Sequence, residues 1–235
     1  MKFHLSKMNA KVISVALGLM LAFLPTCALH AQSSNNQEAN AFYAQGAKYL
    51  DAGDYAKALE AFKKAVDLDP NLSDAVQGEG VCHYELGNFA LARTAFLQYL
   101  SRKKDNATIF ILVGKSDIEL KNYTEAEQAF QSAIGLKPDT QNLNDAYYNL
   151  GLTYYYLHQF PKSVTAYQQA LRLQPRDAVT LSDLGVVYVQ LGRRDDAIQV
   201  YKTLLPIDTK RAQGLLDSIN QLQSSPSQAR QPSER

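Results

Sequence analysis

The sequence predicts an all-α protein built as a stack of about five helical hairpins, and three observations point to this fold class. Glycines recur at intervals of 34, 34, 37 and 34 residues, at Gly46, Gly80, Gly114, Gly151 and Gly185. Large apolar residues lie three or four positions apart around each glycine, as they do on one face of an α-helix. Prolines close most of the repeats. A fixed period of this length predicts one supersecondary unit per repeat.

Composition places the chain among ordered globular proteins, because 46% of its 235 residues are hydrophobic and 20% are charged. The formal net charge is +1, and three of the 24 basic residues are Lys2, Lys7 and Lys11. Without those three, 21 basic residues face 23 acidic ones, a balance of −2. Such a chain has no general attraction for nucleic acid or anionic lipid, so neither is expected as a partner.

Residues 1–31 have the pattern of a secretory signal peptide. The three lysines precede an apolar run of 13 residues that extends from Val12 to Leu24. A membrane-spanning helix needs about 20 such residues, so this run is short for a span. We prefer cleavage after Ala31, with cleavage after Ala28 as the alternative. The expected localisation is the periplasm or the cell exterior, and an uncleaved anchor is a further alternative.

Cys27 leaves another interpretation open. The segment Leu24-Pro25-Thr26-Cys27 distantly resembles the lipobox of bacterial lipoproteins, in which the cysteine becomes the lipidated N-terminus. Pro25 and Thr26 depart from that pattern, which has a very small residue before the cysteine. Lipidation at Cys27 would attach the protein to a membrane, with the outer membrane as one option. Without it, no membrane association is expected.

Cleavage beyond Cys27 leaves Cys82 as the one remaining cysteine, so no internal disulfide is expected. Cys82 lies within an apolar helical pattern, and we expect it to be a small buried residue. Nothing in the neighbouring sequence indicates an activated thiolate.

Five repeats are predicted, over residues 39–72, 73–106, 107–143, 144–177 and 178–211. Small residues such as Gly46, Ala58 and Ala65 recur at equivalent positions and let the two helices of a hairpin approach closely. The longer third interval falls within the polar segment 139–144, where a loop tolerates an insertion that a helix would not.

Glycines and prolines also indicate where the hairpins turn and where their second helices end. Glycine falls between the two helices of three repeats, at Gly53, Gly87 and Gly192. A left-handed backbone costs glycine little at such a place. Lys121 and His158 replace it in repeats three and four. Proline cannot continue a helix and ends the second helix of three repeats, at Pro70, Pro138 and Pro175.

These positions resemble the tetratricopeptide repeat family over residues 39–211. The resemblance implies a right-handed superhelical solenoid whose first helices line a concave groove. It also implies a non-catalytic adaptor or scaffold that binds protein or peptide segments.

The ends of the array are expected to differ from its repeats. Residues 32–38 are predicted to be a linker and residues 223–235, rich in Ser, Gln and Pro, a disordered tail. Between them and the repeats, residues 212–222 are predicted to form a capping helix that covers the last apolar face. Its apolar side would hold Ala212, Leu215, Leu216, Ile219 and Leu222.

No catalytic or metal-binding constellation is recognisable, so no enzyme, cofactor or metal is predicted. The four histidines are far apart in the sequence, at His4, His30, His83 and His158. There is no His-Glu-x-x-His pair, and the glycines are spaced one per helix and not as a phosphate-binding loop.

The family resemblance places certain positions of each first helix in the groove. Counted from Ala39, Ser73, Ala107, Asn144 and Ala178, these are positions two, five, six, nine, twelve and thirteen. They contribute the candidate peptide-binding residues Tyr43, Gln77, Tyr84, Lys115, Tyr148, Asn149 and Tyr155. Asp183, Val186 and Val189 are further inner residues of repeat five. Tyrosine offers a large contact area and a hydroxyl at low entropy cost, which suits an extended peptide or a partner helix.

Some of these tyrosines are instead expected to pack between neighbouring repeats. Tyr154, Tyr155 and Tyr156 are consecutive, so at least one of them must be exposed or line the groove. Family members that grip acidic chaperone tails carry Lys at position five and Asn at position nine. Repeat one has Tyr43 and Ala47 there, so that carboxylate clamp is not expected.

Three hypotheses follow for the function. The first is an exported adaptor with a tyrosine-lined groove. The second is a structural scaffold that self-associates, and the third is an envelope lipoprotein that assists assembly of a surface complex. Sequence alone does not identify the partner or the oligomeric state.

Overall fold

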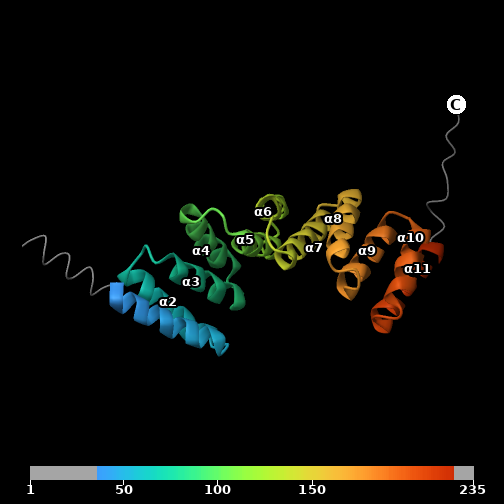
Figure 1. The fold of residues 1–235 in the computed structure, drawn as a ribbon. Coiled ribbons are helices and arrows are strands. Elements are labelled where there is room, and N and C mark those ends of the chain that lie inside the picture. The colour runs from blue at the N-terminus through green and yellow to red at the C-terminus, as the bar shows by residue number, and fades with distance from the viewer. Residues whose placement is uncertain (1–35, 225–235) are drawn as a thin grey trace, which may run out of the picture. The chain divides into compact units, whose positions relative to one another are not determined.

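The structure, a computed structural model, describes residues 36–224, and every regular element in that range is α-helical (Figure 1). The predicted signal peptide and Cys27 lie outside the described residues. The chain divides into an N-terminal unit, Met1–Leu86, and a C-terminal unit, Gly87–Arg235. Each is considered by itself. The division falls inside predicted repeat two, between its first and second helices.

Eleven helices follow one another through the described range. The first covers residues 36–51, and the others are α2 (Tyr55–Leu68), α3 (Ser73–Glu85), α4 (Phe89–Arg102), α5 (Ala107–Glu119), α6 (Tyr123–Gly135), α7 (Thr140–Tyr156), α8 (Phe160–Leu173), α9 (Ala178–Gln190), α10 (Arg194–Leu204) and α11 (Thr209–Ser224). Short turns join them into consecutive helical hairpins. The all-α hairpin fold predicted from the sequence is confirmed.

Two helices begin or end at residues other than those predicted. The first helix begins at residue 36, within the segment 32–38 that was predicted to be a linker. Helix α11 begins at Thr209 and continues to Ser224, so it is longer at both ends than the predicted 212–222. The rest of the predicted tail lies outside the described residues.

Local chemistry explains where several helices begin. Asp54, Asn106, Asp139 and Asp177 stand just before α2, α5, α7 and α9, and each side chain accepts a hydrogen bond from a backbone amide of the first turn. Such caps satisfy amides that have no partner within the helix.

The turns between paired helices have the predicted left-handed conformation. The φ angles are positive at Gly53, Gly87 and Gly192, at 73°, 76° and 68°. Lys121 and His158, which replace glycine, have φ angles of 62° and 57°. Lys137, just after helix α6, also has a positive φ, at 51°, although no turn glycine or equivalent was predicted there.

In the N-terminal unit the core lies between α2 and α3. Phe62 of α2 is 1% exposed and packs with Ala58, Ala65, Ala75 and Cys82. Cys82 is buried, as its apolar neighbourhood predicted. Burial, the largest cause, and the nearby Glu79 raise the pKa of its thiol to about 11. The thiol is therefore held in its unreactive protonated form.

In the C-terminal unit each glycine near the middle of a first helix is covered by a large side chain. A Cβ added to Gly151 would lie 2.6 Å from the Tyr167 ring, and one added to Gly185 would lie 2.4 Å from a Leu215 methyl. These contacts show how the small residues of the repeat bring two helices together.

Helix α11 closes the last hairpin, because it packs against both α9 and α10. Ala212, Leu215 and Ile219 are buried in the same core cluster as Leu184 and Leu204. Its opposite side is polar.

Candidate functional site

The candidate site lies on the first helices of the hairpins in the C-terminal unit. Helix α7 contacts α5 on one side and α9 on the other, so these three helices form a continuous surface. We call this surface the inner face. Of the residues predicted to line it, Lys115 comes from α5, and Tyr148, Asn149 and Tyr155 come from α7.

The structure places these four residues differently. Tyr148 and Tyr155 are half-buried and lie toward α9. Lys115 is half-buried on α5 and does not line the same hollow. Asn149 is 8% exposed, and its side-chain amide donates to the Asp145 carbonyl at 2.7 Å. Asn149 is therefore largely buried, and its amide is bonded within helix α7.

A hollow of about 110 Å³ opens between α7 and α9. Its walls are formed by Leu152, Tyr155, Tyr167, Asp183 and Val186. Three kinds of contact are therefore available to an incoming side chain: aromatic rings, aliphatic groups and one carboxylate.

The carboxylate is held in place by Tyr148. The Tyr148 hydroxyl donates to Asp183 Oδ2 at 3.1 Å, and the Tyr148 ring lies 5.8 Å from the ring of Tyr167. Burial raises the pKa of Asp183 above its usual range, while the Tyr148 hydrogen bond and the charge of Arg211 oppose that shift. Burial and the Asp183 charge also raise the pKa of Tyr148, so its hydroxyl stays protonated and remains a donor.

The three consecutive tyrosines of α7 point in three directions, as their spacing requires. Tyr154 is buried, donates to Glu127 Oε1 at 3.1 Å and accepts from Gln131 Nε2 at 3.3 Å. Tyr155 lines the hollow. Tyr156 is 42% exposed and stacks on Tyr123, with ring centroids 4.9 Å apart. The expectation that at least one would be exposed or line the groove is confirmed.

The other predicted site residues belong to the N-terminal unit. Tyr43 lies on the first helix, and its ring is 5.9 Å from that of the core residue Phe62. Gln77 and Tyr84 are half-buried on α3. These three residues therefore do not help to define the hollow, which is formed entirely within the C-terminal unit.

Sequence reasoning missed three contributors to the site. Tyr167 comes from the second helix of its hairpin, and its ring reaches the inner face because Gly151 leaves room above it. Leu152 occupies position nine of repeat four, which is a predicted groove position, but it was not among the candidate binding residues. Arg211 is the last residue of predicted repeat five and lies on α11, and no sequence signal linked it to Asp183.

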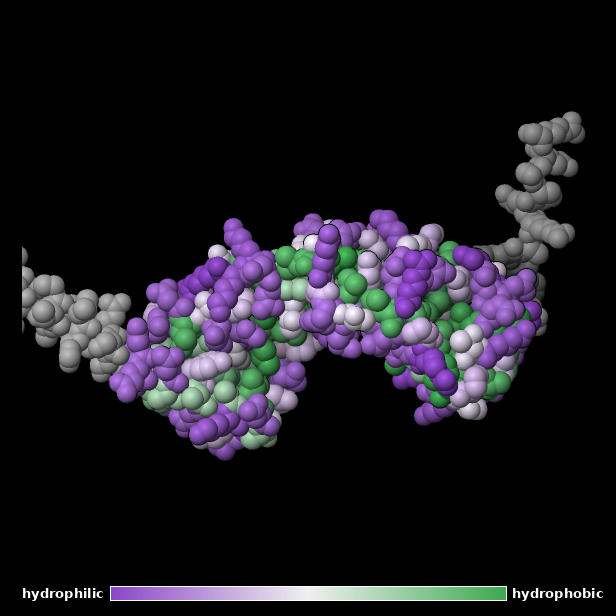
Figure 2. Space-filling model, viewed as in Figure 1, coloured by the Kyte–Doolittle hydropathy of each residue, from purple (hydrophilic) through white to green (hydrophobic). Residues whose placement is uncertain are grey.

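Neither a metal site nor a membrane span is found in the described part of the chain. Within residues 36–224, no three His, Cys, Asp or Glu side chains are close enough together to hold a metal ion. In the same range, no helix combines the length and hydrophobicity needed to cross a bilayer. On the side shown in Figure 2, hydrophilic residues predominate, with hydrophobic ones in scattered patches.

The hairpins and the aromatic inner face define a helical-repeat protein. Models of the tetratricopeptide repeat match residues 49–115, 107–140 and 142–210, which together cover well over half of the chain. The chain belongs to the tetratricopeptide repeat family.

Individual relatives are distant and mostly much longer. A TPR repeat-containing protein of Methanocaldococcus jannaschii is 29% identical over 165 residues, which are 66% of this chain and 28% of that protein. A BBSome complex member of Caenorhabditis elegans is 23% identical and is covered over 39% of its length. The chain thus spans less than half of these relatives.

Solved structures match over most of their length. A crystal structure of MamA is 26% identical, with a TM-score of 0.66, and the match covers 72% of this chain and 96% of that one. YrrB, described as a TPR protein with an unusual peptide-binding site, is 19% identical, with a TM-score of 0.67. That match covers 80% of this chain and 97% of YrrB, and it shows a shared fold.

Proposed function

We propose that this protein is an exported, non-catalytic adaptor that holds segments of other proteins along the inner face of its C-terminal unit. Membership of the tetratricopeptide repeat family supports a protein-binding role. The leader pattern in residues 1–31 supports export, with the periplasm or the cell exterior as the proposed location. Repeat proteins specify a shape, so the partner must be argued from the side chains on it.

The hollow beside Asp183 is the observation that carries the proposal. A half-buried carboxylate held by Tyr148 lines the same hollow as Tyr155 and Tyr167. Aromatic faces attract cations, and a carboxylate pairs with ammonium or guanidinium groups. A lysine or arginine side chain of the bound segment therefore fits this hollow. Its aliphatic stem would pack on Leu152 and Val186.

The positive charge of Arg211 could compete with a bound cation for the Asp183 carboxylate. Arg211 is near enough to lower the pKa of Asp183, although burial has the larger effect in the opposite direction. Its guanidinium also pairs with Asp208, with Arg211 Nε 3.2 Å from Asp208 Oδ2. Because Arg211 pairs with Asp208, and no ion pair joins it to Asp183 among the described residues, the Asp183 carboxylate keeps the capacity to accept a cation.

A randomised peptide library tests the proposal directly. Peptides retained by the mature chain should be enriched in lysine or arginine at one position. Asp183→Asn should remove that enrichment, and Tyr155→Ala should weaken binding of an enriched peptide about tenfold, or 1.4 kcal/mol. Lys202→Ala on the exposed side of α10 is the control and should change neither result. Unchanged selection by Asp183→Asn would refute the proposal.

Export is tested separately by N-terminal sequencing of the protein made with its leader. A mature chain that begins at Gln32 supports cleavage after Ala31. Palmitate labelling that depends on Cys27 would instead support the lipoprotein alternative.

A further inference from the structure

A recurring contact joins each hairpin of the C-terminal unit to the helix before it. Position eleven of the first helix receives the contact each time. Tyr154 bonds to Glu127 and Gln131 of α6, and Tyr188 accepts from Gln168 of α8 at 3.1 Å. In both repeats the tyrosine hydroxyl thus bonds to polar side chains of the preceding helix. For Tyr154 these side chains, Glu127 and Gln131, are four residues apart.

This contact lies on one surface of the hairpin, which we call the leading face. It consists of positions four, seven and eleven of the first helix and positions 19, 22, 23 and 26 of the second. In repeat four these positions line a hollow of about 240 Å³ beside α6: Tyr147, Leu150, Tyr154, Lys162, Thr165, Ala166 and Gln169. Helix α6 packs against α7 and buries Ala146 and Leu150 next to Tyr154.

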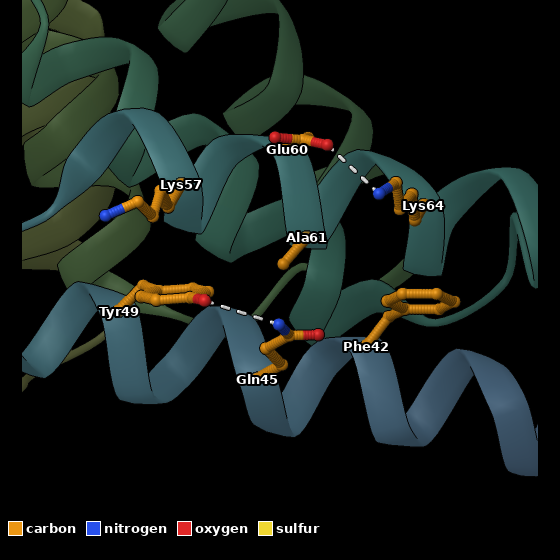
Figure 3. A pocket seen from close by; sticks show the side chains of 7 residues that line it. All are labelled: Phe42, Gln45, Tyr49, Lys57, Glu60, Ala61 and Lys64. Carbon is orange, nitrogen blue, oxygen red and sulfur yellow. Dashed lines mark hydrogen bonds and ion pairs between the residues drawn. The ribbon is translucent and has the colours of Figure 1, made fainter.

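The same positions of repeat one line a hollow of about 210 Å³ in the N-terminal unit (Figure 3). Its side chains are Phe42, Gln45, Tyr49, Lys57, Glu60, Ala61 and Lys64. No described helix precedes this hairpin. Ala41 and Gln45 are exposed accordingly, whereas their equivalents Ala146 and Leu150 are buried.

The two leading faces share their chemistry. Lys57 lies 5.7 Å from the centre of the Tyr49 ring, and its equivalent Lys162 lies 5.2 Å from that of Tyr154. A second lysine, Lys64, lies 5.6 Å from the centre of the Phe42 ring. Figure 3 shows both rings on the first helix and both lysines on α2. The Tyr49 hydroxyl accepts from Gln45 at 3.4 Å, a long contact within its own helix.

We propose that the leading face of repeat one docks an amphipathic helix of a partner protein, with an acidic side chain and a carboxamide four residues apart. Tyr49 would bond to that pair as Tyr154 bonds to Glu127 and Gln131. Lys57 and Lys64 would attract the carboxylate. Their present partners, Asp54 at 2.6 Å and Glu60 at 3.0 Å, form solvent-exposed pairs, which are weak and exchange readily.

A partner helix is the occupant that the charges favour, because Lys57 and Lys64 complement an acidic helix such as α6. This docking site is distinct from the inner face and does not depend on the function proposed for it.

A stapled peptide with the sequence of α6, Tyr123–Gly135, is a suitable probe because it carries the Glu127 and Gln131 pair. The full mature chain should bind the labelled peptide in a fluorescence anisotropy titration. A peptide with Glu127→Lys and Gln131→Ala should bind at least tenfold more weakly. Lys64→Glu in the protein should also weaken binding about tenfold, and Tyr49→Phe should weaken it severalfold while leaving the fold intact.

Two control variants locate the bound peptide. Tyr154→Phe tests whether the peptide replaces helix α6 in its contact with α7. This variant should bind the peptide with unchanged affinity. Tyr155→Ala should also leave it unchanged, which separates this site from the inner face. Absence of binding, or equal affinity for Lys64→Glu and the unaltered chain, would overturn the proposal. Self-association of the chain in sedimentation that Lys64→Glu abolishes would also overturn it, because the occupant would then be a second copy.

Discussion

Arg93 Nε donates to Asp117 Oδ1 at 2.7 Å and joins α4 to α5 through a carboxylate whose side chain is 1% exposed. Asn122 donates to the same oxygen at 3.2 Å. Asp117 occupies position eleven, where repeats one, four and five have tyrosine. An ion pair here replaces the tyrosine hydrogen bond that links neighbouring hairpins elsewhere.

We predict that Arg93→Met destabilises the C-terminal unit by about 3 kcal/mol, because it leaves a buried carboxylate without its charged partner. The double variant Arg93→Met with Asp117→Leu should recover most of that loss, since an apolar pair requires no desolvated charge. Urea unfolding of both variants gives the comparison. Arg172→Met, at an exposed site on α8, is the control and should change stability by less than about 0.5 kcal/mol. A double variant no more stable than Arg93→Met would contradict this account.

A second prediction concerns the close approach of Gly151 to Tyr167. Gly151→Ala places a methyl group 2.6 Å from a ring that is 1% exposed, so the ring cannot move away freely. We expect a loss of about 1–3 kcal/mol, the usual result of overpacking a core. Because Tyr167 also lines the hollow, peptide binding should weaken as well.

Gly135→Ala is the matched control for that substitution. Nothing lies within 4 Å of a Cβ added to Gly135, which ends helix α6. Alanine should therefore raise stability by about 0.5–1 kcal/mol through its better helix propensity. If Gly151→Ala and Gly135→Ala changed the stability by the same amount, close packing against Tyr167 would not explain why residue 151 is glycine.

The hairpins were predictable because their signals are local and repeated. Gly53 and its equivalents mark turns, Pro70 and its equivalents mark helix ends, and apolar spacing marks helix faces. Those features depend on backbone conformation and on periodicity within a few residues. They therefore predicted the fold class without any knowledge of tertiary contacts.

The candidate site was less predictable, because its residues meet across helices. Tyr148 and Asp183 are both groove positions, but their hydrogen bond joins residues 35 apart in the sequence. Asn149 was expected beside them, yet it is 8% exposed and its amide donates to the Asp145 carbonyl of its own helix. Tyr167 enters from a second helix, which a rule based on first helices excludes. The division between Leu86 and Gly87 had no sequence signal either.

A third prediction uses the strained turn at Lys121. Its φ of 62° disfavours any residue with a Cβ, and three of the other four turns of this type, at Gly53, Gly87 and Gly192, have glycine. Lys121→Gly should stabilise the protein by about 0.5–1 kcal/mol, because relief of that strain exceeds the added chain entropy. Lys202→Gly, at an exposed helical position of α10, should instead cost about 1 kcal/mol. Thermal unfolding that shows a loss for both variants would disprove the strain at residue 121.

The last prediction is a pH dependence centred on His83 in the N-terminal unit. His83 is 5% exposed, and its Nδ1 has no hydrogen-bond partner among the described residues. Burial is the main cause that lowers the pKa of His83; Glu79 opposes this shift and Lys63 adds to it. The folded state therefore favours the neutral imidazole, and the unfolded state accepts a proton more readily.

The sign of the effect follows from this difference. Above the unfolded value of about 6.5, both states are neutral and the stability is complete. As the pH falls below that value toward the lower folded pKa, the unfolded state gains protons first and stability decreases. His83→Gln removes the titrating group, so the stability of this variant should vary less with pH across this window than that of the unaltered protein. Carboxylates that titrate at lower pH contribute equally to the stability curves of both proteins. Parallel stability curves between pH 7 and pH 5 would show that protonation of His83 does not oppose folding.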